Sequence, residues 1–323
     1  MVLAFHVTST PFLRDPAGLP VFTMGLAGVD VFFVISGFVM FVSTERPGVT
    51  PAKFWTARFV RIAPLYYLYT LVFLVLIFAA DLWPADFSPI EIVKSFLFIP
   101  FENSLNGQPV PLLGVGWTLN YEALFYLVFG SALLLPDRRL QVLSMTVVFG
   151  VLIAGRFTLD PEGVVMTRFT SPILLEFLAG AGLAMYYIRY GGGRPQAGAL
   201  LIAAGTIALF LVAALYPNMP RTIGFGIPAV FVLQGFVFCE KYFHAPCFAP
   251  LRLFGDASYS IYLTHGIVIH AAVLLLVPLT GPNAVVSLIV VAVALAAGLL
   301  SYEYVEHPLL AVSRHLIQKA SAR

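Results

Sequence analysis

Long apolar runs separated by short polar intervals dominate the chain. Most of these runs approach the roughly 20 residues that a helix needs to cross a hydrocarbon layer of about 30 Å. Nine runs predict helices, at residues 26–42, 62–80, 117–135, 142–153, 173–188, 199–215, 223–238, 261–279 and 284–300. The pattern therefore predicts an all-α fold, a polytopic integral membrane helical bundle.

A tenth helix would be the first one in the chain. Residues 1–7 are apolar, but at about 1.5 Å per residue they are too few to cross a bilayer. The segment also lacks the basic leading region, the apolar core and the small-residue cleavage site of a signal peptide. We therefore expect about ten transmembrane helices, the first one truncated at the N-terminus.

Composition supports the membrane class and excludes others. Hydrophobic residues make up 60% of the chain and charged residues 11%, with a mean hydropathy of +0.93, whereas about a quarter of the residues in soluble domains are charged. A net charge of +2 gives no indication of a nucleic-acid partner. The two cysteines, Cys239 and Cys247, have no histidine or acidic residue at metal-site spacing. We expect one integral membrane domain over residues 1–323, surrounded by a lipid bilayer and without a metal.

Basic residues predict the orientation of the helices. If the loop after the first complete run is cytoplasmic, thirteen of the eighteen Lys and Arg residues fall on that side. These are Arg46, Lys53, Arg58, Arg61, Arg138, Arg139, Arg189, Arg194, Lys241, Arg252, Arg314, Lys319 and Arg323. Arg14, Lys94, Arg156, Arg168 and Arg221 remain outside. We expect a multi-pass protein of the inner (cytoplasmic) membrane with its C-terminus in the cytoplasm and its longest outward loop at residues 81–116.

A few polar side chains interrupt the apolar runs, where ionisable groups are costly and commonly functional. Asp30 and Ser36 lie in the first complete run, and Glu122 lies about a turn and a half inside the run that opens at Trp117. Glu122 can also be a structural partner for an arginine of the bundle. His6, on the first apolar segment, is either a structural donor or a functional group.

A second set of polar residues lies mostly near the ends of the predicted helices. Arg58 and Arg61 share one helix face at i and i+3, which suits phosphate oxygens, and a cytoplasmic membrane anchor explains the pair equally well. His265 lies within a span, and Glu306 lies near the inner end of the last one, where acids are often solvated. Tyr259 resembles an interfacial aromatic anchor.

The order of these blocks, more than any one of them, resembles the membrane acyltransferase family 3, and particularly its bacterial branch that O-acetylates exopolysaccharides and related glycans. Six blocks follow the family's order across essentially the whole chain. They are His6, residues 28–38 with Asp30, Arg58 and Arg61 before Ile62 and Pro64, Trp117 to Leu119 with Glu122, Ser258 to Leu263 with His265, and Ser301 and Tyr302 with Glu306 and Pro308.

The resemblance implies a bundle of about ten helices that moves an acyl group, usually acetyl from acetyl-CoA, to a sugar hydroxyl. It implies that Arg58 and Arg61 bind the phosphates of the acyl-CoA donor and that His6 is the catalytic base. Asp30 and Glu122 remain alternatives as the acid that orients the histidine. The partners expected are acyl-CoA, a sugar or polysaccharide acceptor and the lipid bilayer.

This assignment agrees with the chemistry of acyl transfer. A sugar hydroxyl is a poor nucleophile, and a histidine with an ordinary pKa of about 6.5 can activate it. A carboxylate on the other ring nitrogen fixes the tautomer. Ser36, Tyr259 and Trp117 are candidate donors to the developing oxyanion. Both direct transfer and transfer through an acyl intermediate fit these residues.

The chain departs from the family pattern before His6, where members carry an arginine and about ten further apolar residues and this sequence has five residues in all. The competing function is a proton-coupled transporter or flippase of a glycan or lipid-linked sugar, in which the buried acids and histidines relay protons. Lipopolysaccharide, peptidoglycan, a Nod-type oligosaccharide and a macrolide-like molecule are alternative acceptors to exopolysaccharide.

Overall fold

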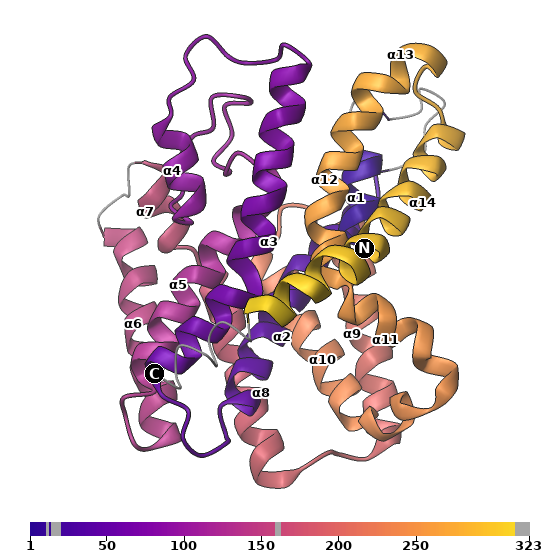
Figure 1. Ribbon diagram of the computed structural model, residues 1–323. Helices are drawn as coiled ribbons and strands as arrows, with labels where there is room; N and C mark the ends of the chain where they lie inside the picture. Colours follow the sequence, from indigo (N-terminus) through magenta and orange to yellow (C-terminus); the bar gives the residue numbers. More distant parts are fainter. Residues whose placement is uncertain (11–12, 14–20, 159–162, 314–323) are drawn as a thin grey trace. The chain divides into compact units, whose positions relative to one another are not determined.

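The computed structural model describes residues 1–10, 13, 21–158 and 163–313 (Figure 1). No strand forms within these ranges, where one isolated bridge joins Asn103 to Gln108. The α-helices are α1 (Val2–Ser9), α2 (Ala27–Ser43), α3 (Pro51–Ala79), α4 (Ile90–Phe96), α5 (Trp117–Ala132), α6 (Arg138–Thr158), α7 (Val164–Phe169), α8 (Leu174–Tyr190), α9 (Pro195–Leu215), α10 (Ile227–Phe238), α11 (Ala249–Asp256), α12 (Ser258–Leu275), α13 (Val277–Thr280) and α14 (Ala284–Ser301). The all-α prediction is confirmed.

All nine predicted apolar runs are helical. Seven helices of the described chain are long and apolar enough to cross a membrane, at Thr23–Ser43, Pro51–Ala79, Arg138–Thr158, Val164–Tyr190, Pro195–Leu215, Ser258–Leu275 and Ala284–Ser313. The apolar helix Thr222–Phe238 and the 16-residue α5 are shorter. A multi-pass membrane protein is confirmed, whereas a count of about ten spans is not. Arg14, Arg314, Lys319 and Arg323, which entered the orientation prediction, lie outside the described residues.

The chain divides into two compact units. Unit 1 comprises Met1–Phe5, Thr23–Phe54 and Tyr121–Ala249. Unit 2 comprises His6–Phe22, Trp55–Asn120 and Pro250–Arg323. Both units are therefore assembled from segments that are far apart in the sequence.

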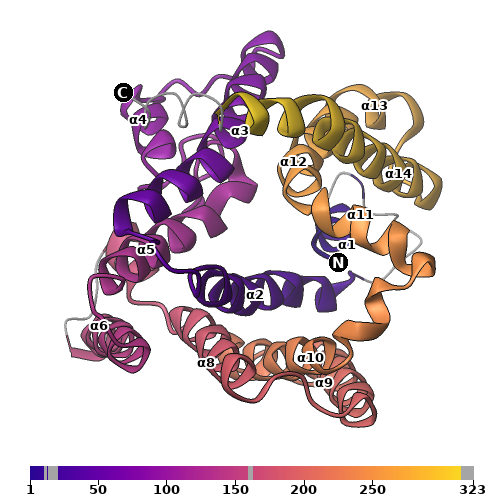
Figure 2. The same cartoon turned by 60° about the horizontal axis from the view of Figure 1, so that its bottom comes forward.

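Close helix contacts through glycine hold unit 1 together. Figure 2 shows α8 and α10 beside α2, and α9 beside α10. A Cβ added to Gly37 of α2 would collide with the carbonyl oxygen of Phe177 in α8, and one added to Gly180 of α8 would collide with that of Val34. The two backbones touch because both glycines lack a side chain, as is common between helices in membranes. This contact fixes α2, which carries Asp30.

In unit 2, α12 packs along α14 (Figures 1 and 2). Gly298 of α14 lies against Ile261 of α12, where an added Cβ would come 2.6 Å from the Ile261 Cα. A buried cluster joins α12 to α3 and α5 through Tyr66, Leu119 and Leu263, each at most 2% exposed. This packing positions α3, α5 and α12, on which most of the predicted site residues of this unit lie.

Candidate active site

Two histidines of unit 2 face each other. His6 of α1 and His265 of α12 have ring centres 5.2 Å apart, with ring planes inclined by 42°. His6 is half-buried, and His265 is 1% exposed. The Nδ1 atom of His265 lies 3.2 Å from the Ile261 carbonyl oxygen, one turn earlier in the same helix. The structure thus brings together two residues that the sequence singled out 259 positions apart.

The predicted arginine pair lies on α3, also in unit 2. Arg58 and Arg61 are both half-buried. Arg61 Nη1 forms an ion pair with Glu306 Oε1, and the guanidinium carbon lies 5.9 Å from the ring centre of Tyr259. Arg61 is therefore held by a carboxylate and an aromatic ring, an arrangement more specific than that of a membrane anchor.

Glu306 is buried, at 1% exposure, whereas an acid at the exit of a helix is usually solvated. It ends the π-helical turn η6 (Tyr302–Glu306), and π-turns are frequent at functional sites. Ser260 Oγ donates to Glu306 Oε2 at 2.6 Å, and Ser301 Oγ lies 3.1 Å from Ser260 Oγ. Tyr69 donates to Ser301 at 2.6 Å. Both oxygens of Glu306 thus have partners, which lowers the free-energy cost of burying the charge.

Trp117 and Tyr259 lie at helix ends in unit 2. Trp117 begins α5 and is half-buried. The Tyr259 hydroxyl donates at 2.8 Å to the carbonyl oxygen of Ile62, which is the residue after Arg61. Tyr262 donates to the Val115 carbonyl oxygen, and its hydroxyl lies 2.9 Å from Thr118 Oγ1. These tyrosines therefore join α12 to the interior of α3 and to the start of α5.

Asp30 lies in unit 1, fully buried on α2, and is paired with Arg221. Arg221 Nε donates to Oδ1 at 3.0 Å and Nη2 donates to Oδ2 at 2.8 Å, a bidentate pair. Arg221 Nη2 also donates to the Leu26 carbonyl oxygen at 3.0 Å. The π-helical turn η3 (Thr222–Gly226) follows Arg221 directly. The pair ties α2 to the segment that leads into α10.

Glu122 and Ser36 form the second polar cluster of unit 1. They are 4% and 5% exposed, and Ser36 Oγ donates to Glu122 Oε1 at 2.9 Å. The Tyr126 hydroxyl donates to the same oxygen. The structure therefore brings Ser36 and Glu122 together and gives each of the two candidate orienting acids its own partners within unit 1.

Sequence reasoning missed two residues at the Asp30 cluster, Arg221 and Glu176. Glu176 is 2% exposed, neither carboxylate oxygen has a hydrogen-bond partner among the described residues, and a Cβ on Gly226 would lie 3.0 Å from its Oε1. The signal for Glu176 was present, since it interrupts the run 173–188 as Asp30 interrupts its own. For Arg221 the signal was weaker, because an arginine that follows Pro220 in the interval between two apolar runs resembles any other basic residue of a loop.

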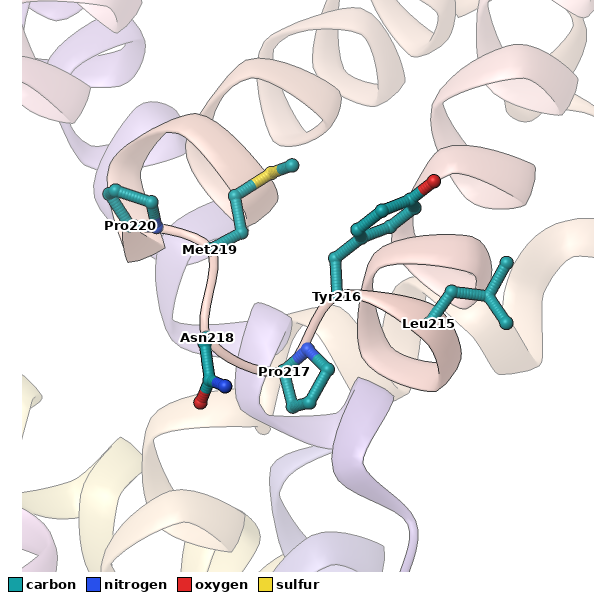
Figure 3. Close-up of a pocket in the computed structure, with 6 residues that line it drawn as sticks. All are labelled: Leu215, Tyr216, Pro217, Asn218, Met219 and Pro220. Carbon is teal, nitrogen blue, oxygen red and sulfur yellow. The ribbon is translucent and has the colours of Figure 1, made fainter.

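A surface hollow of ≈ 360 Å³ lies in unit 1 between α9 and η3. Figure 3 shows its lining, which comes from one segment, Leu215, Tyr216, Pro217, Asn218, Met219 and Pro220. None of the predicted site residues lines it. Among the described residues, no group of three or more His, Cys, Asp or Glu side chains could hold a metal ion.

Comparison with known proteins identifies the class. The family model described as an acyltransferase domain, that of acyltransferase family 3, matches residues 1–302, and the chain belongs to this family. It is therefore a membrane enzyme that transfers acyl groups other than amino-acyl groups. The family resemblance inferred from the order of the sequence blocks is confirmed.

The similar proteins include an exopolysaccharide protein and two acyltransferases. The chain is 39% identical over 248 residues to the exopolysaccharide production protein ExoZ of Rhizobium meliloti, covering 76% of each chain. It is 27% identical over 325 aligned positions to the peptidoglycan O-acetyltransferase OatA of Listeria monocytogenes, covering 88% of this chain but 51% of OatA. Identity to the acyltransferase MdmB of Streptomyces mycarofaciens is 27%, over 95% of this chain and 87% of MdmB. No solved structure matches significantly.

Proposed function

We propose that this enzyme transfers an acyl group, acetyl in the simplest case, from acyl-CoA to a hydroxyl of an exopolysaccharide sugar or its lipid-linked precursor. The similarity to the exopolysaccharide protein and to the peptidoglycan O-acetyltransferase supports a glycan acceptor. The observation that carries the proposal is the pair formed by half-buried His6 and buried His265. It supplies a candidate base in the same unit as the two arginines.

In the proposed reaction His6 takes the proton of the acceptor hydroxyl. The hydroxyl oxygen then attacks the thioester carbonyl, the C–S bond breaks, and the proton on His6 passes to the departing CoA thiolate. The reaction therefore needs no net proton or electron from elsewhere. In the alternative route, His6 first takes the acyl group and the CoA thiol leaves, and the sugar hydroxyl attacks the acyl-histidine in a second step. This route also needs no net proton or electron from elsewhere.

Arg58 and Arg61 are proposed to bind the phosphates of CoA. Guanidinium groups suit phosphate oxygens because their N–H groups form a planar fork. The ion pair with Glu306 holds Arg61 in place and compensates part of its charge, while Arg58, one turn earlier, adds a second cation. The two residues thus combine a positioned fork with a net positive charge.

The other proposed roles are constrained by hydrogen bonds. Asp30 and Glu122 are proposed as supporting acids of the reaction, and each is held by its own partners within unit 1. Ser36 and Tyr259 each donate their hydroxyl hydrogen to a protein acceptor, so either one must give up that bond to stabilise an oxyanion. Trp117 is the third candidate donor, through its indole N–H. The location in the inner membrane with a cytoplasmic C-terminus is part of the proposal, since it places Arg58 and Arg61 on the side that holds CoA.

The test is acyl transfer in membranes that contain the protein, supplied with labelled acetyl-CoA and a glycan extract of the host. His6→Ala and Arg58→Ala should abolish labelling of the glycan. His244→Ala and Arg139→Ala, at exposed positions outside the proposed site, serve as matched controls and should retain it. Labelling that persists in His6→Ala refutes the assignment of the base, and no labelling by the wild-type protein refutes acetyl-CoA as donor.

A further inference from the structure

The ring of His265 has one buried nitrogen with nothing to bind. His265 is 1% exposed, and its Nε2 atom has no hydrogen-bond partner among the described residues. A buried polar atom without a partner destabilises the folded protein. Such an atom in a native protein needs an explanation, and one explanation is a group that binds it during the reaction.

The opposite nitrogen determines what Nε2 can do. Nδ1 lies 3.2 Å from the Ile261 carbonyl oxygen, and a carbonyl oxygen only accepts hydrogen bonds. Nδ1 therefore carries the hydrogen, and in the neutral ring Nε2 carries a free electron pair. A second hydrogen on Nε2 would create a buried cation with no acceptor, which is far less favourable. Nε2 of His265 is therefore a buried hydrogen-bond acceptor that can take a donor.

His6 is at the right distance to be that donor. Two imidazoles joined by a straight N–H···N bond have ring centres about 5 Å apart, because their nitrogens are ~3 Å apart and each lies ~1 Å from its ring centre. The rings of His6 and His265 have centres 5.2 Å apart. At this separation, an orientation of the half-buried His6 ring in which an N–H faces Nε2 forms the bond.

Two other side chains of α12, those of Tyr262 and His270, do not offer an equal donor. The Tyr262 ring centre lies 5.7 Å from that of His265, but the Tyr262 hydroxyl donates to the Val115 carbonyl oxygen. His270 lies five residues further along α12, its side chain is exposed, and its Nδ1 lies 2.7 Å from the Gly266 carbonyl oxygen. His270 therefore repeats the hydrogen bond of His265 without the burial, which makes it a matched control.

We infer that His265 is a positioning residue whose Nε2 accepts the N–H of His6, leaving the other nitrogen of His6 as the base for the acceptor hydroxyl. This inference rests on the proposed function of His6. The hydroxyl proton moves to His6, and the positive charge that forms is stabilised by the electron pair of His265. The same proton then leaves His6 for the CoA thiolate. His265 thus does for His6 what a carboxylate does in a Ser-His-Asp triad.

The test compares two replacements of similar size with the His270 control. His265→Phe keeps a ring but removes the acceptor, and should lower kcat about 10²-fold or more while KM for acetyl-CoA changes less than about twofold. His265→Gln restores an acceptor oxygen near the position of Nε2. Its kcat should therefore be at least tenfold higher than that of His265→Phe. His270→Phe should retain activity. The amount of folded protein, followed by size-exclusion chromatography in detergent, normalises every rate.

Equal losses of kcat in the Phe and Gln variants of His265, or a loss carried by KM, overturn the inference. A readout that does not depend on transfer covers failure of the proposed function. In protein labelled with ¹⁵N-histidine, NMR should show His265 protonated at Nδ1 and unprotonated at Nε2, with the Nε2 signal shifting in His6→Phe. Wild-type protein that is inactive with acetyl-CoA but gives these signals refutes the proposed donor alone. A protonated Nε2, or an Nε2 signal that does not change in His6→Phe, refutes the pairing of His6 with His265.

Discussion

Removal of Arg221 should destabilise unit 1 by leaving the Asp30 carboxylate without its partner. Asp30 is fully buried and receives two hydrogen bonds from Arg221, whose side chain is 33% exposed. Breaking a fully buried pair costs about 3–5 kcal/mol, and the partial exposure of Arg221 reduces this to about 2–3 kcal/mol for Arg221→Gln. Asp30→Asn should cost less, about 1–2 kcal/mol, because the remaining guanidinium is partly hydrated.

The double variant makes the argument quantitative. Both replacement side chains are uncharged amides, so Asp30→Asn combined with Arg221→Gln should be about 1–2 kcal/mol more stable than the sum of the single losses predicts. The assay is the midpoint of thermal aggregation in detergent, with Arg139→Gln as the exposed control. At about 2–4 °C per kcal/mol, Arg221→Gln should lower the midpoint by about 4–12 °C. A midpoint equal to that of the control, or strict additivity, would refute a stabilising ion pair.

The same variants separate structure from catalysis. If the Asp30 carboxylate takes part in catalysis, the double variant should be folded and yet lose acyl transfer about 10²-fold or more per folded molecule, because the carboxylate is gone. If Glu122 has that role, the double variant should keep most of its activity and Glu122→Gln should lose it. The two alternatives that the sequence leaves open are therefore decided by one pair of measurements, each made at equal amounts of folded protein.

Three further predictions concern other parts of the chain. Gly37→Val should abolish accumulation of folded protein on size-exclusion chromatography, since a Cβ there collides with the α8 backbone; a normal elution profile would contradict the close contact. Glu306→Gln should raise KM for acetyl-CoA about tenfold with kcat nearly unchanged, because Arg61 loses the charge that holds it, and a fall in kcat alone would contradict this. Asn106→Cys, in the loop proposed to face outward, should react with an impermeant maleimide on intact cells. Cys247 should react only after permeabilisation, and the reverse pattern would show that the proposed orientation is wrong.

Hydropathy was sufficient to locate the nine apolar helices because each apolar run is a local property of the sequence, but it did not locate the short helices α4, α7 and α11. It also located Asp30, Glu122 and His265 as buried polar groups, which the structure confirms at 0%, 4% and 1% exposure. It could not count the spans, because length and apolarity alone do not decide whether α5, with 16 residues, crosses the bilayer. The two compact units also could not be predicted, since each combines three separate segments.

Partners of the buried groups were beyond the reach of sequence reasoning. Arg221 is 191 residues from Asp30, and Glu306 is 245 residues from Arg61, so neither pairing leaves a local pattern. Both ion pairs also depend on how the helices of each unit pack, which sets the distances but is invisible in hydropathy. What the sequence did provide was the short set of residues whose partners had to be found.

The π-turn that ends at Glu306 makes this position sensitive to chain length. A π-turn contains one more residue than the α-helical turn it replaces. Deleting one residue from Tyr302–Glu306 would restore a regular helical turn and leave the direction of the chain after it nearly unchanged, because the π-turn fits its extra residue within one turn. The wider turn that presents Glu306 to Arg61 and Ser260 would be lost although every other side chain had been kept. Among related chains, a gap of one residue here therefore carries more information than many substitutions.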